Sequence, residues 1–67
     1  MIGVITKVVG DRGFGFIRRT DGEADVFFHH RSLDRTLIFS SALVGESVQF
    51  DVQQNEKGPR AVNVRAI

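Results

Sequence analysis

The sequence contains no cysteine among its 67 residues, so it has neither a disulfide framework nor a thiolate metal site. This absence fits a reducing cytosol, and we expect a cytoplasmic protein. No apolar run approaches the roughly 20 residues that a membrane-spanning helix needs. The segment Met1–Ile5 lacks the basic stretch and small-residue cleavage site of a signal peptide. We therefore expect a mature, soluble chain that does not associate with membranes.

The sequence also has almost no excess of one charge over the other. Nine basic and eight acidic residues give a formal net charge of +1, so the overall charge says little about a nucleic-acid partner. Any electropositive surface must come from the placement of individual side chains. Most of the basic residues are arginine, which stacks on bases and binds phosphate with two parallel hydrogen bonds. A chain of 67 residues has room for one domain with a small core.

Two phenylalanine-rich segments, 12–19 and 25–30, dominate what is present. Asp21-Gly22 lies between them, and Asp-Gly between apolar runs is a strong signal for a two-residue hairpin turn. We therefore expect two paired strands, at about residues 13–18 and 24–29. Counting outward from the turn predicts the pairs Thr20–Glu23, Arg18–Asp25, Phe16–Phe27 and Phe14–His29.

Side chains alternate along a strand, so this hairpin has two different faces. The predicted faces consist of Phe14, Phe16, Phe27 and His29 on one side, and Ile17, Val26 and Phe28 on the other. Phenylalanine is usually a core residue, but the second face is more purely apolar and makes the better core. Rings left outside forgo roughly 1.5–3 kcal/mol of burial each. We therefore expect the first face to point outward for a function, and flat rings suit unstacked nucleic-acid bases.

Four segments together resemble the cold-shock domain of bacterial cold-shock proteins and Y-box proteins: 3–5, 11–17, 25–29 and 57–59. Gly-Phe-Gly-Phe followed by Asp-Val-Phe-x-His makes the match specific, and it extends from Gly3 to Val64. The resemblance implies an all-β fold, a five-stranded antiparallel Greek-key β-barrel of the OB type, with residues 1–67 as a single cold-shock domain. It also implies binding of single-stranded RNA or DNA, without enzymatic activity or a cofactor.

The remaining sequence fits five strands. Residues 2–9 are rich in β-branched side chains, and residues 46–53 alternate with valine and phenylalanine facing inward. Residues 54–59 have the composition of a turn. Residues 60–66 alternate again, with Ala61 and either Val62 or Val64 in the core, depending on a bulge.

The segment 30–45 has no strand or helix periodicity beyond a single helical turn near Ser32. Such a long connection in a small domain is usually functional or mobile. In the cold-shock family it carries an aromatic residue that joins the binding face, and Phe39 is the candidate. Alternatively, residues 37–39 pack on the end of the barrel or form a contact for a protein partner. We expect a monomer, with exchange of this loop as the route to a dimer.

The predicted nucleic-acid site joins stacking rings to basic and polar contacts. Phe14, Phe16 and Phe27 are the stacking platforms, and the histidine opposite Phe14 stacks on a base or hydrogen-bonds to it. Asp25 either accepts a hydrogen bond from a base edge or pairs with Arg18. With the expected phosphate and base contacts added, the complete predicted set is Lys7, Arg12, Phe14, Phe16, Asp25, Phe27, His29, His30, Arg31, Phe39, Lys57 and Arg60.

Several positions depart from the usual cold-shock pattern. The family usually has tryptophan where Lys7 stands, phenylalanine where Val8 stands and another aromatic residue where His30 stands. One stacking platform is therefore missing, and Lys7 either contacts phosphate in its place or is solvated. We expect weaker binding than in relatives, or a preference for shorter strands.

Metal and enzyme functions have little support. His29 and His30 are adjacent, but neighbours on a strand point to opposite faces and no third ligand is near in the sequence, so we expect no metal site. Ser32 and Asp34 lie near the histidines without anything to orient a catalytic relay. Residues 12–17 also fit the start of the RNP1 motif of RNA-recognition motifs, but that fold needs two helices that this sequence lacks.

Overall fold

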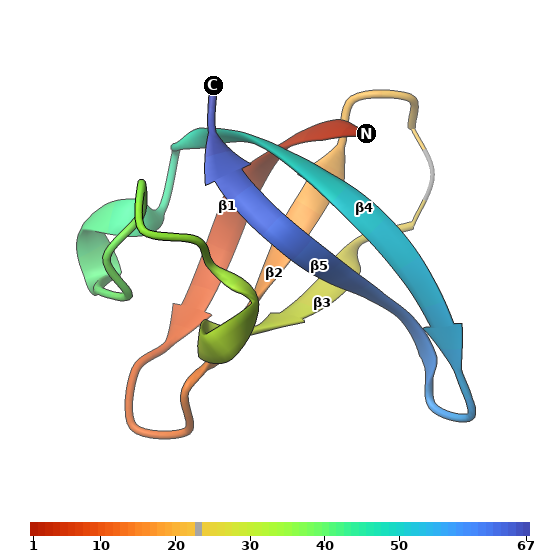
Figure 1. Ribbon diagram of the computed structural model, residues 1–67, viewed down its shortest axis with the longest axis horizontal. Helices are drawn as coiled ribbons and strands as arrows, with labels where there is room; N and C mark the ends of the chain where they lie inside the picture. The colour runs from red at the N-terminus through yellow and green to blue at the C-terminus, as the bar shows by residue number, and fades with distance from the viewer. Residues whose placement is uncertain (23) are drawn as a thin grey trace.

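The chain forms five strands and two single turns of 3-10 helix within residues 1–22 and 24–67, which the computed structural model describes (Figure 1). In chain order these elements are β1 (Ile2–Val9), β2 (Phe14–Arg19), β3 (Val26–His29), η1 (His30–Ser32), η2 (Ser41–Leu43), β4 (Ser47–Asn55) and β5 (Gly58–Ala66). Over this part of the chain no helix is long and apolar enough to cross a membrane. The predicted all-β class is confirmed.

The strands close into a barrel in the order β1-β2-β3-β5-β4, with β4 returning to β1. In Figure 1, β4 and β5 cross in front of the other three strands. Every pairing is antiparallel except that of β3 with β5, which is parallel and joins Phe27 to Arg60 and Phe28 to Ala61. The predicted five-stranded Greek-key barrel is therefore confirmed, and the long connection after β3 is what brings β5 alongside it in the same direction.

The register of the β2–β3 hairpin is the predicted one, with Phe14 opposite His29 and Phe16 opposite Phe27. The predicted two-residue turn is wrong, because β2 ends at Arg19 and β3 begins only at Val26. The N–H and the hydroxyl of Thr20 both donate to the carbonyl of Ile2, each at 3.1 Å. These bonds hold the chain leaving β2 against β1 instead of turning it straight back to β3.

The charges near this turn also differ from the prediction. Within the described residues no ion pair joins Arg18 to Asp25, and Arg19 pairs instead with Asp21. A partner two residues away folds back over the turn at little entropic cost, which favours it over one across the diverging strands. Glu23 lies outside the described residues, and with it the predicted Thr20–Glu23 pair.

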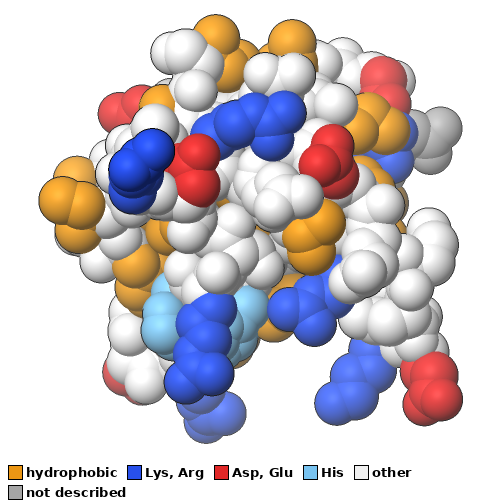
Figure 2. Space-filling model, in the orientation of Figure 1, with side chains coloured by type: hydrophobic (Ala, Val, Ile, Leu, Met, Phe, Trp, Pro, Cys, Tyr) orange, Lys and Arg blue, Asp and Glu red, His pale blue; other side chains and the backbone are white. Residues whose placement is uncertain are grey.

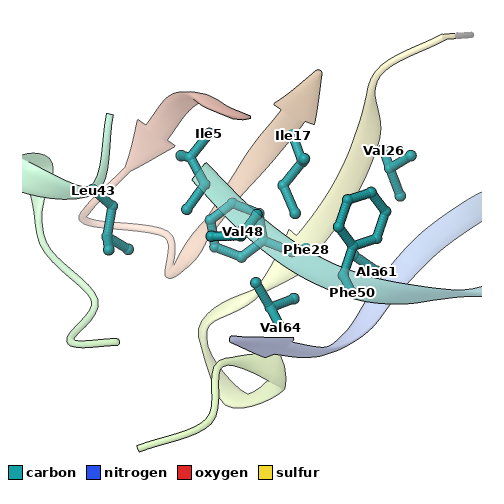
Figure 3. Packing of buried hydrophobic residues seen from close by; sticks show 9 residues of the cluster. All are labelled: Ile5, Ile17, Val26, Phe28, Leu43, Val48, Phe50, Ala61 and Val64. Carbon is teal, nitrogen blue, oxygen red and sulfur yellow. The ribbon is translucent and has the colours of Figure 1, made fainter. Parts of the chain in front are cut away.

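The core lies inside the barrel and takes the inward side chains of every strand (Figure 3). Its buried members are Ile5, Ile17, Val26, Phe28, Leu43, Val48, Phe50, Ala61 and Val64. Gly15 makes room for the largest of them, because a Cβ atom there would lie 2.7 Å from Cε1 and Cζ of the Phe28 ring. Glycine in the middle of β2 is thus a packing requirement of this core.

The last two strands settle the predicted bulge. The β4–β5 register shifts between Gln49 and Asp51, and Asn63 on the facing strand has a positive φ of 54°. Between the pairs formed by Gln49 and Asp51, β5 has one residue more than β4, which is a β-bulge. The bulge places Val64, rather than Val62, in the core beside Ala61. The turn between the strands is tighter than predicted, since β4 continues to Asn55 and β5 begins at Gly58.

The long connection 30–46 is fixed to the barrel near both ends. The Asp34 N–H donates to the Val64 carbonyl at 2.8 Å, and the Ala66 N–H donates to the Thr36 hydroxyl at 2.9 Å. The hydroxyl and backbone N–H of Thr36 both donate to the Asp34 carboxylate, which lowers the pKa of Asp34 below its ordinary value. At the other end, the Gly45 N–H donates to the Ile5 carbonyl at 2.8 Å.

Candidate nucleic-acid interface

Three phenylalanine rings form a cluster on the outside of the β2–β3 hairpin. The ring centroids are 5.9 Å apart for Phe14 and Phe16, 5.4 Å for Phe14 and Phe27, and 6.1 Å for Phe16 and Phe27. Phe16 meets both neighbours edge to face, at 88° and 74°. Each ring is half-buried, because the rings shield one another while keeping part of their surface in solvent. The predicted outward orientation is confirmed.

A groove of about 490 Å³ runs from this cluster to the β4–β5 hairpin. It is lined by Phe16, Phe27 and His29 on one side and by Asn55, Lys57, Gly58, Pro59 and Arg60 on the other. The structure thus brings two of the predicted basic residues to the predicted rings. Asn55 and Pro59 are groove residues that the sequence did not identify. Their turn composition was the available signal, but it does not show which surface a turn faces.

Arg60 lines this groove beside Phe27, because its backbone pairs with that of Phe27 across the β3–β5 junction. Its side chain is half-buried, and its Nε is buried without a hydrogen-bond partner. Lys57 is exposed at the rim, where its N–H donates to Oδ1 of Asn55 at 2.9 Å and helps to shape the turn. Of these two basic side chains that line the groove, Arg60 is therefore half-buried and Lys57 is exposed.

The two adjacent histidines stack on each other, with ring centroids 4.4 Å apart and an interplanar angle of 34°. The prediction that the two side chains point to opposite faces is wrong, because β3 ends at His29 and the chain turns into η1 at His30. Two histidines alone do not make a metal site, and the described residues contain no group of three or more His, Cys, Asp or Glu able to hold a metal ion.

The protonation state of His29 follows from its surroundings. Partial desolvation lowers its pKa from the ordinary 6.5, and the positive charges of His30, Arg31 and Arg60 lower it further. Nδ1 of His29 accepts a hydrogen bond from the Arg31 N–H at 3.2 Å. The neutral ring therefore carries its proton on Nε2, which is left as a donor for a ligand in the groove.

Phe39 reaches the interface through His30. Its ring centroid lies 5.7 Å from that of His30 and 6.4 Å from that of the core residue Phe28. It is half-buried, so it packs on the barrel end and also extends the row of rings that begins at His29. Gly13 supports this arrangement, because its φ is +77° and a Cβ atom there would lie 2.7 Å from Cδ2 of His30.

The other predicted residues surround the cluster. Lys7 is exposed and pairs with Phe16 in the β1–β2 register, next to a bulge after Ile5. Arg12, Asp25 and Arg31 are exposed on the segments that enter and leave the hairpin strands, and they do not line the groove. Figure 2 shows Lys and Arg side chains gathered beside the two histidines. The rim is therefore basic although the whole chain is nearly neutral.

Comparison with known proteins agrees with this geometry. The family model described as "'Cold-shock' DNA-binding domain" matches residues 1–67. This chain belongs to the cold-shock domain family. Members of that family bind nucleic acids and are not enzymes, and the predicted family membership is confirmed.

The relatives of this cold-shock domain include small bacterial proteins. It is 46% identical over 57 residues to a cold shock-like protein of Aquifex aeolicus, covering 85% of this chain and 80% of that protein. It is 45% identical over 56 residues to the cold shock-like protein CspC of Escherichia coli K12, covering 84% and 80%. Among solved structures, "drosophila Unr CSD456" superposes with a TM-score of 0.78 at 27% identity. That match covers 98% of this cold-shock domain but only 26% of the Drosophila chain.

Proposed function

We propose that this cold-shock domain binds single-stranded RNA or DNA in the cytoplasm by stacking successive bases on the outer rings of the β2–β3 hairpin. The observation that carries the proposal is the cluster of Phe14, Phe16 and Phe27, half-exposed outside a core complete without them. Base–aromatic stacking contributes about 1–3 kcal/mol per base and tolerates every base, because each has a flat face. That contribution offsets the burial these rings forgo.

The polar groups around the rings give the bound strand its direction and hold its backbone. Lys57 lines the groove, and Lys7, Arg12 and Arg31 are exposed on the segments around the hairpin, so all four are available to phosphates of a strand with its bases turned inward. The Nε2 proton of neutral His29 is a donor for a base edge. Asp25 has no ion pair with Arg18 among the described residues, so its carboxylate can accept from a base amino group.

A protein that binds bases on their faces keeps the strand unpaired, since the same bases cannot stack and pair within a duplex. The domain would therefore act as an RNA chaperone, or as a regulator of transcription or translation that changes the structure of its target. No nucleotide hydrolysis is needed, because the free energy comes from binding. The chain would act as a monomer.

Fluorescence anisotropy with a labelled, pyrimidine-rich single strand tests this proposal. Phe16→Ala should weaken binding about 5- to 150-fold, the loss of one stacking platform. Ile38→Ala is the matched control, because Ile38 is 82% exposed on the connecting loop, away from the groove, and its removal should leave affinity unchanged. Equal affinity of wild type and Phe16→Ala, with both proteins folded, would contradict the proposal.

A second function is favoured by the exposure of Ile38 itself. An isoleucine with 82% of its surface in solvent beside half-buried Leu37 and Phe39 would suit a contact with a protein partner or a second copy. Sedimentation velocity at increasing concentration separates the two functions. Self-association that Ile38→Ala abolishes, with no nucleic-acid binding, would favour an interaction module.

A further inference from the structure

Arg60 differs from every other predicted basic contact in its position within the groove. It lies on β5, with its backbone paired to that of Phe27, whereas Lys57 is exposed at the rim. Its side chain is half-buried and its Nε is fully shielded. Part of the Arg60 side chain is therefore packed against the barrel, and it lines the groove on the same face as Phe27.

The guanidinium of Arg60 is also unpaired. Within residues 1–22 and 24–67 it makes no hydrogen bond or ion pair, although its Nε is buried. The other arginine with a shielded Nε, Arg19, is compensated by its ion pair with Asp21. A charged group held in a groove without a partner is a donor set left for a ligand.

The position of Arg60 favours a base edge over a phosphate as that ligand. If bases lie flat on Phe16 and Phe27, their edges point sideways along the floor of the groove, where Arg60 is, and the phosphates lie outside at the rim. Among the purines, guanine alone offers two adjacent acceptors, O6 and N7, that match the two parallel donors of a guanidinium. Adenine presents a donor beside its N7, and in thymine the N3–H donor separates the two carbonyl oxygens. Unpaired cytosine has the adjacent acceptors O2 and N3, but O2 lies next to the sugar and so toward the phosphates at the rim, whereas O6 and N7 of guanine lie on an edge further from the sugar.

We propose that Arg60 gives this domain a preference for guanine at the base position beside Phe27, through paired hydrogen bonds from the guanidinium to O6 and N7. The proposal rests on the proposed function, because it needs a base stacked in the groove. It adds to that function a sequence preference that stacking alone does not provide.

The test uses labelled oligothymidylate strands in which one position at a time is replaced by guanine, adenine or cytosine. Wild type should bind a strand with guanine at one particular position at least about fivefold more tightly than its adenine and cytosine counterparts. Replacing that guanine with 7-deazaguanine, which lacks the N7 acceptor, should remove the preference. Replacing it with hypoxanthine, which keeps O6 and N7 but lacks the amino group, should retain it.

Two variants assign the preference to the side chain. Arg60→Gln should lose the guanine preference while still binding oligothymidylate, and Arg60→Lys should lose it too, because an ammonium lacks the paired donors. Arg65→Gln removes an arginine from the same strand, one that donates to the Asn63 carbonyl and does not line the groove, and it should keep the preference. Circular dichroism and thermal unfolding confirm that each variant is folded, and the base-analogue comparison needs only the wild type.

Each contrary outcome has a distinct meaning. Wild type that binds oligothymidylate without preferring guanine, or Arg60→Gln that retains the preference, overturns the inference and leaves the proposed function standing. A uniform loss of affinity in Arg60→Gln across all strands, with a salt slope smaller by about one, assigns Arg60 to a phosphate and also overturns the inference. Wild type that binds no single strand overturns both.

Discussion

The two faces of the β2–β3 hairpin use the same kind of residue for opposite purposes. Phe28 lies on the inner face with 0% of its surface exposed, and Phe27, the preceding residue, lies half-exposed on the outer face. The inner ring fills the barrel, and the outer rings contact mainly one another. In this domain, the side of the strand rather than the residue type decides whether a phenylalanine stabilises the fold or is available to a ligand.

The largest effect should come from breaking the inner face. Phe28→Ala should lower the free energy of unfolding by about 3–5 kcal/mol, because it removes a fully buried ring and leaves a cavity. Small domains have about 5 kcal/mol or slightly more in total, so much of the variant should be unfolded at room temperature. Urea unfolding followed by circular dichroism measures this. A loss below about 1 kcal/mol would show that the ring is not part of a close-packed core.

A substitution at Gly15, on the inner side of β2, also tests how closely the inner face is packed. Gly15→Ala should cost about 1–3 kcal/mol in unfolding free energy, because the added methyl group would overlap both the backbone carbonyl oxygen of Lys7 and the Phe28 ring. Gly10→Ala is the matched control, since no atom lies within 4 Å of a Cβ at that position. Thermal unfolding of the two variants should separate them clearly. Equal midpoints would mean that the β1 backbone at Lys7 and the Phe28 ring can both shift without cost.

A substitution on the outer face should weaken nucleic-acid binding more than it lowers the stability of the fold. Phe27→Ala should weaken binding of a short single strand by about 1–3 kcal/mol, the contribution of one stacked base. Its effect on unfolding should be well below that of Phe28→Ala, because Phe27 is only half-buried. Anisotropy titration and urea unfolding on the same preparation give both quantities. If Phe27→Ala instead unfolds the domain as Phe28→Ala does, the division between the faces is wrong.

Salt dependence distinguishes stacking from charge on the outer face. With about three to five phosphates contacted by the rim, log affinity should fall with log salt concentration at a slope of about −2 to −3.5. Titrations at a series of sodium chloride concentrations measure the slope. A slope steeper than about −6 would mean that backbone charge, not stacking, dominates binding.

The smallest expected effect is that of pH: lowering the pH should strengthen binding but reduce the stability of the fold. The pKa of His29 lies below 6.5, so the ring is neutral at pH 7, and a bound polyanion favours its protonation. Affinity should therefore rise severalfold as pH falls from about 8 to 5.5. The lowered pKa also means that His29 contributes stability above about pH 6.5 that is lost as pH falls through the folded-state pKa. His29→Gln should reduce the affinity change, and a flat wild-type profile would remove both His29 and His30 from the interface.

Much of the hairpin could be predicted because strand alternation and the Asp-Gly signal act locally. They gave the Phe16–Phe27 register and the inward set of Ile17, Val26 and Phe28. The prediction of a two-residue turn failed because Thr20 hydrogen-bonds to Ile2, at the start of the chain. That contact is long-range, and a local pattern does not contain it.

The arrangement of the site depends on the same long-range closure. The sequence predicted Lys57 and Arg60 as contacts, but it did not reveal that both line one groove with the rings, Arg60 half-buried and Lys57 exposed. That difference arises from the parallel pairing of β3 with β5, two strands separated by the long connection and β4. The stacking of His29 on His30 was missed because it depends on the residue at which β3 ends.

The junction of β3 with β5 gives the ligand a mechanical role as well. Over the described residues these strands meet only at Phe27–Arg60 and Phe28–Ala61, the shortest pairing in the barrel wall. Local opening should start where a wall has fewest bonds. A nucleic-acid strand that stacks on Phe27 and bonds to Arg60 would connect β3 to β5 and so stabilise their pairing. The β3 amide hydrogens should then exchange with solvent more slowly in the bound domain than in the free domain, because the bound strand stabilises the closed barrel.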